Sequence, residues 1–225
     1  MNQGVNKQSV YSMGAVCVYI TGFCYLLIVL CALISPKPIA SYIASKNYFI
    51  DFEWYRNYFI LLKYLMAIAN AMMVGVVISL FFLSEGKTAG WFIFLSILAI
   101  VGLGIGMFQS ILDGTQIPHL AMQYEKASPI IQHVMIAFGV ADPAIYILSL
   151  GIPGIWLIFI NWVYRKKFPL ALVVLGIAWG LGSIITVFAH LFVIIWLIYF
   201  IAYSALIGVP LWTFFQGKYL RKKAK

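Results

Sequence analysis

The stretch Phe108–Pro143, FQSILDGTQIPHLAMQYEKASPIIQHVMIAFGVADP, decides how the rest of the chain is interpreted. It is the longest segment without the pattern of a membrane-spanning helix, and it holds two of the three histidines and three of the six acidic residues. Long apolar runs stand on both sides of it. Such a segment between hydrophobic spans indicates an extramembrane loop, where a polar site can form.

Composition places the chain in a membrane. Of its 225 residues, 64% are hydrophobic and 9% charged, and the mean hydropathy is +1.00. Six acidic and fifteen basic side chains cannot cover the surface of a soluble protein of this size. The net charge of +9 does not indicate nucleic-acid binding, because the bases gather just beyond apolar runs, as in Arg165–Lys167 and at the C-terminus. We expect one membrane domain over residues 1–225, with lipids as its partners.

The apolar sequence divides into six runs of spanning length. A bilayer crossing needs about 20 helical residues. Residues 169–215 contain no Asp, Glu, Lys or Arg. As one helix they would be about 70 Å long, against a hydrocarbon core of about 30 Å, so they hold two spans with a turn near 188–191. The predicted spans are 11–34, 58–83, 90–111, 143–164, 169–188 and 191–215.

The predicted fold is therefore an all-α bundle of six transmembrane helices with interfacial helices in the outer loops. The aromatic-rich segment 36–57 is expected to lie in the membrane interface. Segment 113–141 is expected to hold a turn at Asp113 and surface-lying helices broken at Pro129. Asp142-Pro143 is typical of a helix N-cap followed by proline at the first helical position.

Lys and Arg are distributed unequally between the two sides of this topology. Leaving out Lys63, which lies inside a span, ten bases fall on the side of the termini and four on the other side. The positive-inside rule then places both termini in the cytoplasm. The segment 113–141, the beginning of the second span and the ends of the third and fifth spans consequently face outward.

This orientation gathers the candidate site residues at the outer face. The predicted ligand-binding cluster consists of Lys63, Asp113, His119, His133, Asp142 and His190, and Asn70 and Gln109 are polar residues within spans. Lys63 and Asp113 are expected at similar depth on neighbouring antiparallel helices, where an ion pair would relieve the cost of a buried lysine. The alternative is that the Lys63 side chain reaches outward to the interface.

No pattern in the sequence specifies a metal site, a cofactor or a catalytic residue. His119 and His133 are separated by Pro129 and lack the spacing of paired metal ligands. Ser110 is near Asp113, but no nucleophile motif surrounds it. We therefore predict no metal, no cofactor and no catalytic residues, although a metal bound by the outer histidines stays an alternative.

Small residues predict where helices approach closely. Ala67, Ala71 and Gly75 recur every fourth residue, and Gly102/Gly106 and Gly176/Gly180 have GxxxG spacing. These faces would pack against neighbouring helices or another copy of the chain. Gly151-Ile152-Pro153-Gly154 predicts a kink in the fourth span.

Several features together resemble a family of bacterial six-span membrane proteins of unknown function. They are Asp113-Gly114 after the third span, HLAMQYEKASP over 119–129, the interrupted fourth span, Phe168-Pro169 and LGIAWGLG over 175–182. The likeness covers roughly residues 100–185. It implies a six-helix protein of the bacterial inner membrane, and it brings neither an activity nor site residues.

The sequence thus favours a non-enzymatic membrane function: binding or moving a small or lipidic ligand, or serving as a subunit of a larger membrane assembly. The alternative is a membrane-embedded enzyme that acts on lipid at the outer face. Transport is supported by the interrupted fourth span and the glycine-rich third and fifth spans. An ion relay is not, because the middle of the spans is nearly free of charge.

Overall fold

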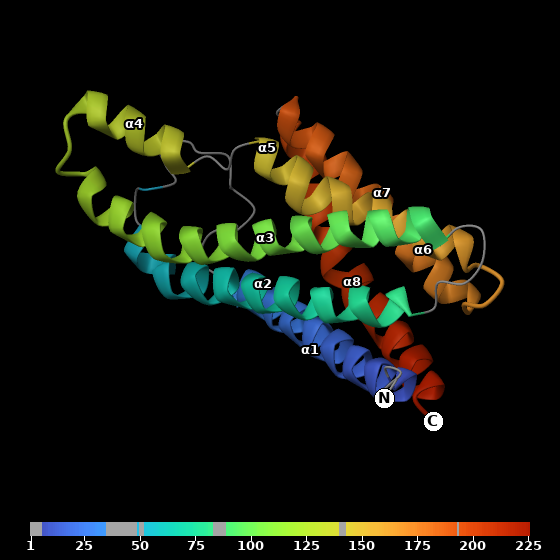
Figure 1. Ribbon diagram of the computed structural model, residues 1–225. Coiled ribbons are helices and arrows are strands. Elements are labelled where there is room, and N and C mark those ends of the chain that lie inside the picture. Colours follow the sequence, from blue (N-terminus) through green and yellow to red (C-terminus); the bar gives the residue numbers. More distant parts are fainter. Residues whose placement is uncertain (1–5, 35–48, 50–51, 83–88, 140–142, 193) are drawn as a thin grey trace, which may run out of the picture.

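The computed structural model describes residues 6–34, 49, 52–82, 89–139, 143–192 and 194–225, and every regular element in these ranges is a helix (Figure 1). The all-α prediction is therefore confirmed for this part of the chain. The predictions for residues 36–48, for the connection at 84–88 and for Asp142 lie outside the described residues.

The elements follow one another in a simple order. They are α1 (Lys7–Ile34), α2 (Phe52–Phe81), α3 (Ala89–Tyr124), α4 (Pro129–Gly139), α5 (Pro143–Tyr146), the π-helical turn η2 (Ile147–Gly151), α6 (Ile152–Val163), α7 (Leu170–Leu191) and α8 (Ile195–Lys223). The break between α7 and α8 comes just after the turn predicted at 188–191. It divides the apolar run 169–215 in two, as its length requires.

Five of these helices, α1, α2, α3, α7 and α8, are long and apolar enough to cross a membrane. The fourth predicted span is divided into α5, η2 and α6, and its apolar part, Ile147–Val163, is shorter than the others. The π-helical turn lies just before Pro153. Proline lacks the N–H that would bond to the carbonyl one turn earlier, so the regular helix is interrupted there. The irregularity predicted at 151–154 is present in this form.

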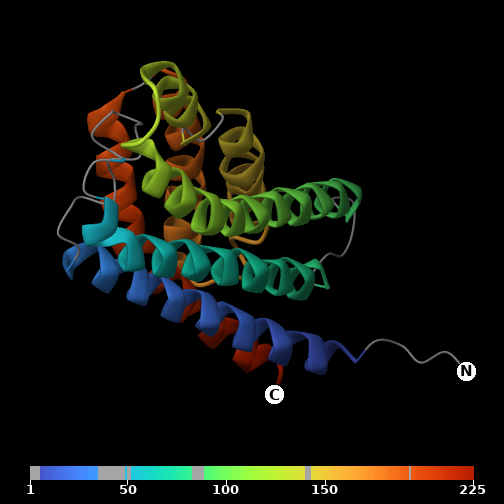
Figure 2. The same cartoon turned by 90° about the vertical axis from the view of Figure 1, so that its left-hand side faces the viewer.

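The helices form a closed ring. α1 packs on α2, α2 on α3, α3 on η2 and α6, α6 on α7, α7 on α8, and α8 returns to α1 (Figures 1 and 2). The main apolar core draws buried side chains from all six of these positions, among them Val18, Val77, Phe92, Trp156 and Trp212. These six helices consequently share one apolar core inside the ring.

α1 begins and α8 ends at the same end of the ring, here named the terminal end (Figure 1). There the Tyr11 hydroxyl donates a hydrogen bond of 3.3 Å to the Phe82 carbonyl. The ring of Tyr164 lies 5.7 Å from that of Phe92, between centroids. These contacts bring together the beginnings of α1 and α3 and the ends of α2 and α6.

At the opposite end, here named the far end, the turn predicted at Asp113 is wrong. α3 continues to Tyr124 through Gly114 and Pro118, so Asp113 lies inside a helix. α2 begins at Phe52, within the segment 36–57 that was predicted to lie in the interface. With 36 and 30 residues, α3 and α2 are about 54 and 45 Å long, which exceeds a hydrocarbon core of about 30 Å. Both helices therefore extend past it. α4 does begin at Pro129, as predicted.

Aromatic packing stabilises this extension. A separate cluster of buried side chains joins the start of α2 to the end of α3 and to α4; it contains Phe49, Phe52, Tyr55, Phe59, Ile117, Ala121, Tyr124 and Met135. The rings of Phe49 and Tyr124 stack with centroids 5.1 Å apart. Phe49, Phe52 and Tyr55 belong to the segment predicted to lie in the membrane interface. Their side chains are buried against protein, whereas that of Trp54 is 76% exposed.

Candidate functional site

The buried ion pair between α2 and α3 is the first feature of the site. The Lys63 ammonium donates a hydrogen bond to Asp113 Oδ2, and Gln109 Nε2 donates one of 2.6 Å to Asp113 Oδ1. The side chains of Lys63 and Asp113 are only 11% and 16% exposed. The predicted ion pair is therefore present, and the alternative in which Lys63 reaches outward is not adopted. Gln109, predicted as an isolated polar residue, is a partner of Asp113.

The depth of this pair follows from the helix lengths. Lys63 lies 18 residues before the end of α2 and Asp113 lies 24 residues after the start of α3. These separations correspond to about 27 and 36 Å from the terminal end. The pair therefore lies near the far boundary of a hydrocarbon core about 30 Å thick. An unpaired charge at that depth would be costly, so each side chain needs the other.

His190 approaches the same region through Tyr146. The two rings lie face to face, with centroids 4.0 Å apart and an interplanar angle of 32°. Nδ1 of His190 lies 2.8 Å from the Thr186 carbonyl, to which it donates. The short helix α5, which carries Tyr146, packs against both α3 and α7. Tyr146, absent from the sequence prediction, thus joins His190 of α7 to the segment that lies beside α3.

The other predicted cluster residues do not join this group. His119 and His133 are exposed on α3 and α4, and Nδ1 of His133 lies 2.6 Å from the carbonyl of Pro129 in its own helix. Asp142 lies outside the described residues. Within the described ranges, no three His, Cys, Asp or Glu side chains are placed to hold a metal ion. Whether the six predicted residues bind a ligand stays a prediction.

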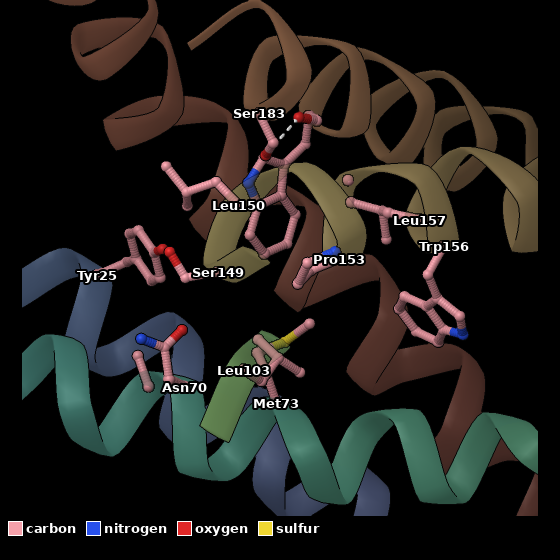
Figure 3. A pocket seen from close by; sticks show the side chains of 13 residues that line it. Tyr25, Asn70, Met73, Leu103, Ser149, Leu150, Pro153, Trp156, Leu157 and Ser183 are labelled. Atoms are coloured by element: carbon pink, nitrogen blue, oxygen red, sulfur yellow. Dashed lines mark hydrogen bonds between the residues drawn. The ribbon is translucent and has the colours of Figure 1, made fainter. Parts of the chain in front are cut away.

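A cavity of about 50 Å³ lies in the centre of the helix ring (Figure 3). Its lining comes from α1, α2, α3, η2, α6 and α7. The polar groups that line it are those of Tyr25, Asn70, Ser149 and Ser183, and much of the remaining wall is Met73, Leu103, Pro153, Trp156 and Trp179. The cavity is therefore mostly apolar, with a few polar groups from four different segments.

The hydrogen bonds of these groups determine what they offer to the cavity. The Ser149 hydroxyl donates to the Ile145 carbonyl at 2.7 Å, and the Ser183 hydroxyl donates to the Trp179 carbonyl at 3.0 Å. With their protons engaged, both oxygens present acceptor lone pairs. The Asn70 amide makes no hydrogen bond with any described residue, so it keeps both donors and acceptors for another partner.

Gly106 creates the space in which two of these side chains meet. A Cβ atom at Gly106 would lie 3.1 Å from Asn70 Nδ2 and 3.2 Å from Ser149 Cβ. Close packing at Gly106 and a polar group within the span at Asn70 were predicted from the sequence. Ser149, Ser183, Tyr25 and Trp179 were not predicted, because serines and aromatics are common in spans and their positions give no periodic signal. The helix interruption at Pro153 was the sequence feature that indicated a cavity in this region.

The cavity and the ion pair lie on the same helix faces. On α2, Asn70 is seven residues from Lys63, and on α3, Gly106, Gln109 and Asp113 share one face. On the interrupted segment, Ser149 follows Tyr146 by three residues. Seven residues correspond to about 10 Å along a helix. The ion pair therefore lies about two helical turns beyond the cavity, towards the far end.

Comparisons with known proteins identify no relative of this chain. It matches no family model, no curated protein and no solved structure. The arrangement of its own residues is therefore the basis for its proposed function.

Proposed function

We propose that the protein is a membrane protein of six crossing segments that binds a small uncharged molecule in its central cavity and passes it across the bilayer. In this proposal α5, η2 and α6 together form the fourth of the six crossings, and its irregular backbone faces the cavity. The observation that carries the proposal is the convergence of Tyr25, Asn70, Ser149 and Ser183, from four segments of the helix ring, on one mostly apolar cavity.

Physical cost supports this interpretation. A polar side chain inside a membrane bundle is unfavourable unless it has a partner, and the Asn70 amide beside the cavity has none among the described residues. π-helical turns are often found at functional sites. Interrupted helices at membrane depth are tolerated where they line a cavity or pack against protein. The π-helical turn at Ile147–Gly151 both lines the cavity and packs against protein.

The polar groups of the cavity favour an uncharged ligand. They are hydroxyls and an amide, and the nearby charges of Lys63 and Asp113 neutralise each other. About 50 Å³ is enough for one or a few water molecules, and a larger solute needs the ring to widen. Water and small neutral solutes such as urea or glycerol have the matching chemistry.

The setting of the protein is part of the same proposal. Large apolar side chains point outward from the ring, for example Phe23 at 60%, Leu33 at 73% and Phe200 at 65% exposure, as contact with lipid would require. The excess of Lys and Arg at the terminal end supports cytoplasmic termini. The bacterial inner membrane is proposed from the resemblance given above, and association with a second copy stays a prediction.

The enzyme alternative has weaker support. A lipid-directed hydrolase needs a nucleophile held against a base. Ser110, the serine nearest to Asp113 in α3, donates its hydrogen bond to the Gly106 carbonyl at 2.7 Å rather than to the carboxylate. The Tyr146–His190 pair lies near Asp113 but contains no activated nucleophile.

Solute flux into proteoliposomes tests the proposal. Purified protein is reconstituted, and vesicle swelling in gradients of glycerol or urea is followed by light scattering. Asn70→Leu keeps the side-chain size and removes the amide, so flux should fall about ten-fold, the effect of losing one hydrogen bond of about 1.4 kcal/mol in the barrier. Ser204→Leu, on the exposed face of α8, is the matched control. Flux equal to that of empty vesicles for water, glycerol and urea would overturn the proposal.

A further inference from the structure

The terminal half of the bundle contains polar side chains whose hydrogen-bonding groups are buried without a partner. Among the described residues, six buried side-chain atoms have no hydrogen-bond partner, and five of them lie in this half. They are Asn161 Oδ1, Trp212 Nε1, Gln216 Nε2, Gln216 Oε1 and Tyr219 OH. Unpartnered groups are rare in folded proteins, and a concentration of them indicates water, a ligand or a functional constraint.

Gln216 is the strongest member of this group. It is 0% exposed, and neither the donor nor the acceptor of its amide has a partner within the described residues. Leu or Met would fill a similar volume at this position without burying an amide. The cost of an unsatisfied amide is largest in a water-excluded interior. A glutamine at this position is therefore better explained by a partner that enters the protein than by packing.

The unpartnered groups on α8 form one stripe. Trp212, Gln216 and Tyr219 are spaced i, i+4 and i+7, which places them on the same face of the helix. The neighbouring face is occupied by α1: a Cβ at Gly22 would lie 2.3 Å from Thr213 Oγ1, and a Cβ at Gly217 would lie 2.5 Å from the Tyr19 ring. The stripe consequently lies beside this contact with α1, and Trp212 at its start reaches Trp179 of α7.

This stripe begins at the central cavity. The indole of Trp212 lies against that of Trp179, with ring centroids 5.1 Å apart, and Trp179 lines the cavity. From Trp212 the stripe runs towards the terminal end, where the ring of Tyr219 lies 4.9 Å from that of Phe168. The cavity and the stripe are therefore consecutive along the axis of the bundle.

Asn161 of α6 adds a polar group beside α7 in this half. Its side chain lies over Gly176, where an added Cβ would be 2.2 Å from Asn161 Nδ2. Nδ2 donates to the Leu157 carbonyl at 2.8 Å, and Oδ1 is left without a partner. Together the stripe and Asn161 offer an indole N–H, two amides and a phenol. All of these are uncharged and suit a neutral hydrogen-bonding molecule.

Tyrosines close the terminal end of this region. Tyr11 and Tyr164 are 8% and 5% exposed in the main apolar core, and Tyr219 packs against that core. The ring of Phe168 lies 5.9 Å from that of Tyr164 and 4.9 Å from that of Tyr219, between centroids. The Tyr11 hydroxyl also bonds to the Phe82 carbonyl at the end of α2. Side chains from α1, α6 and α8 thus converge between the buried amides and the surface.

We propose that Trp212, Gln216 and Tyr219, with Asn161, form a second polar site that continues the central cavity towards the terminal end and receives water or a small neutral solute when the tyrosine closure opens. This site rests on the proposed function: it would form the half of the solute path between the central cavity and the terminal end. In the closed arrangement its groups lack partners, and the entering molecule provides them. The unsatisfied amide of Gln216 therefore favours the open, hydrated arrangement.

Thiol accessibility tests this site without measuring flux. Cys17, Cys24 and Cys31 are replaced by alanine, and Gln216→Cys is treated with N-ethylmaleimide, a small neutral reagent, in proteoliposomes. Leu80→Cys is the matched control, since Leu80 is also 0% exposed at the terminal end but belongs to α2. If opening hydrates the site, Gln216→Cys should react at least about 100-fold faster than Leu80→Cys. Equal, slow reaction of both would overturn the second site.

Gln216→Leu gives an independent readout. Replacing the unsatisfied amide should raise the melting temperature of the purified protein while glycerol or urea flux falls about ten-fold, as expected when hydrogen bonding is lost along the path. A merely structural glutamine would leave flux unchanged, and that result would overturn the site. Absent flux in the wild type together with fast labelling of Gln216→Cys would instead contradict the proposed function and leave the second site standing.

Discussion

Lys63 of α2 and Asp113 of α3 form a largely buried ion pair although 50 residues separate them in the sequence. In an apolar environment neither charge is stable alone, so the pair fixes the alignment of α2 relative to α3. The same alignment places Asn70 of α2 beside Gly106 of α3. The ion pair therefore sets the geometry of the central cavity about two turns away.

Removing one member of this pair should destabilise the protein strongly. Lys63→Met leaves the buried Asp113 carboxylate without its cation and bonded to the Gln109 amide, and breaking a buried pair in this way typically costs about 3–5 kcal/mol. We expect a clear fall in the melting temperature in detergent, followed by intrinsic tryptophan fluorescence.

The controls separate charge from packing. Lys63→Met combined with Asp113→Asn removes both charges and should recover much of the lost stability. Arg56→Met breaks the exposed pair with Glu53, whose atoms are 3.5 Å apart, and should change stability by less than about 1 kcal/mol. A single Lys63→Met variant as stable as the wild type would show that the pair contributes nothing.

Two glycines of α3 should respond oppositely to alanine. A Cβ at Gly102 would lie 2.3 Å from the Leu148 carbonyl oxygen in η2 and 3.0 Å from Pro153 Cδ, whereas nothing lies within 4 Å of a Cβ at Gly104. Gly102→Ala must push α3 away from the π-helical turn, at a cost of about 1–3 kcal/mol. Gly104→Ala should be neutral or stabilising by up to about 1 kcal/mol, because alanine favours the helix. Equal melting temperatures for the two variants would contradict the close approach of α3 and η2.

The hydrogen bond between α3 and α6 predicts a further difference. The Trp156 indole N–H donates to the Ser96 hydroxyl at 3.1 Å, and both residues are 1% exposed. Ser96→Ala leaves a buried donor without a partner, so the free energy of unfolding should fall by about 1–3 kcal/mol. Ser204→Ala, which removes an exposed hydroxyl bonded to its own helix, should have little effect on chemical unfolding. No difference between the two would exclude a stabilising role for this hydrogen bond.

The sequence predicted most of the fold because the physics of a bilayer leaves few choices. An apolar run of 20 or more residues must be a helix, and the length of 169–215 required two of them. The start of α4 at Pro129 and that of α5 at Pro143 also agree with the structure. Proline at the first helical position loses no hydrogen bond, so these boundaries carry a local signal.

The far end was predicted less well because its structure depends on tertiary contacts. Asp113-Gly114 has the composition of a turn, yet the helix continues because Asp113 is paired with Lys63 and because Ile117 and Tyr124 pack in the aromatic cluster. The central site had the same difficulty. Lys63, Asp113 and Asn70 were selected as polar residues in apolar surroundings. Ser149 and Ser183 cannot be distinguished in the sequence from other serines in a span, and only the packing of the helices brings them together at the cavity.

The positions of the two ends predict a labelling pattern across the membrane. His133 is exposed on α4 at the far end, and Lys218 is exposed near the end of α8 at the terminal end. With Lys and Arg concentrated at the terminal end, that end should face the cytoplasm. In a background without the native cysteines, His133→Cys in intact cells should react with a membrane-impermeant maleimide, and Lys218→Cys should react only after the membrane is made permeable. The opposite pattern would invert the topology, and labelling of both in intact cells would rule out placement of the two ends on opposite sides.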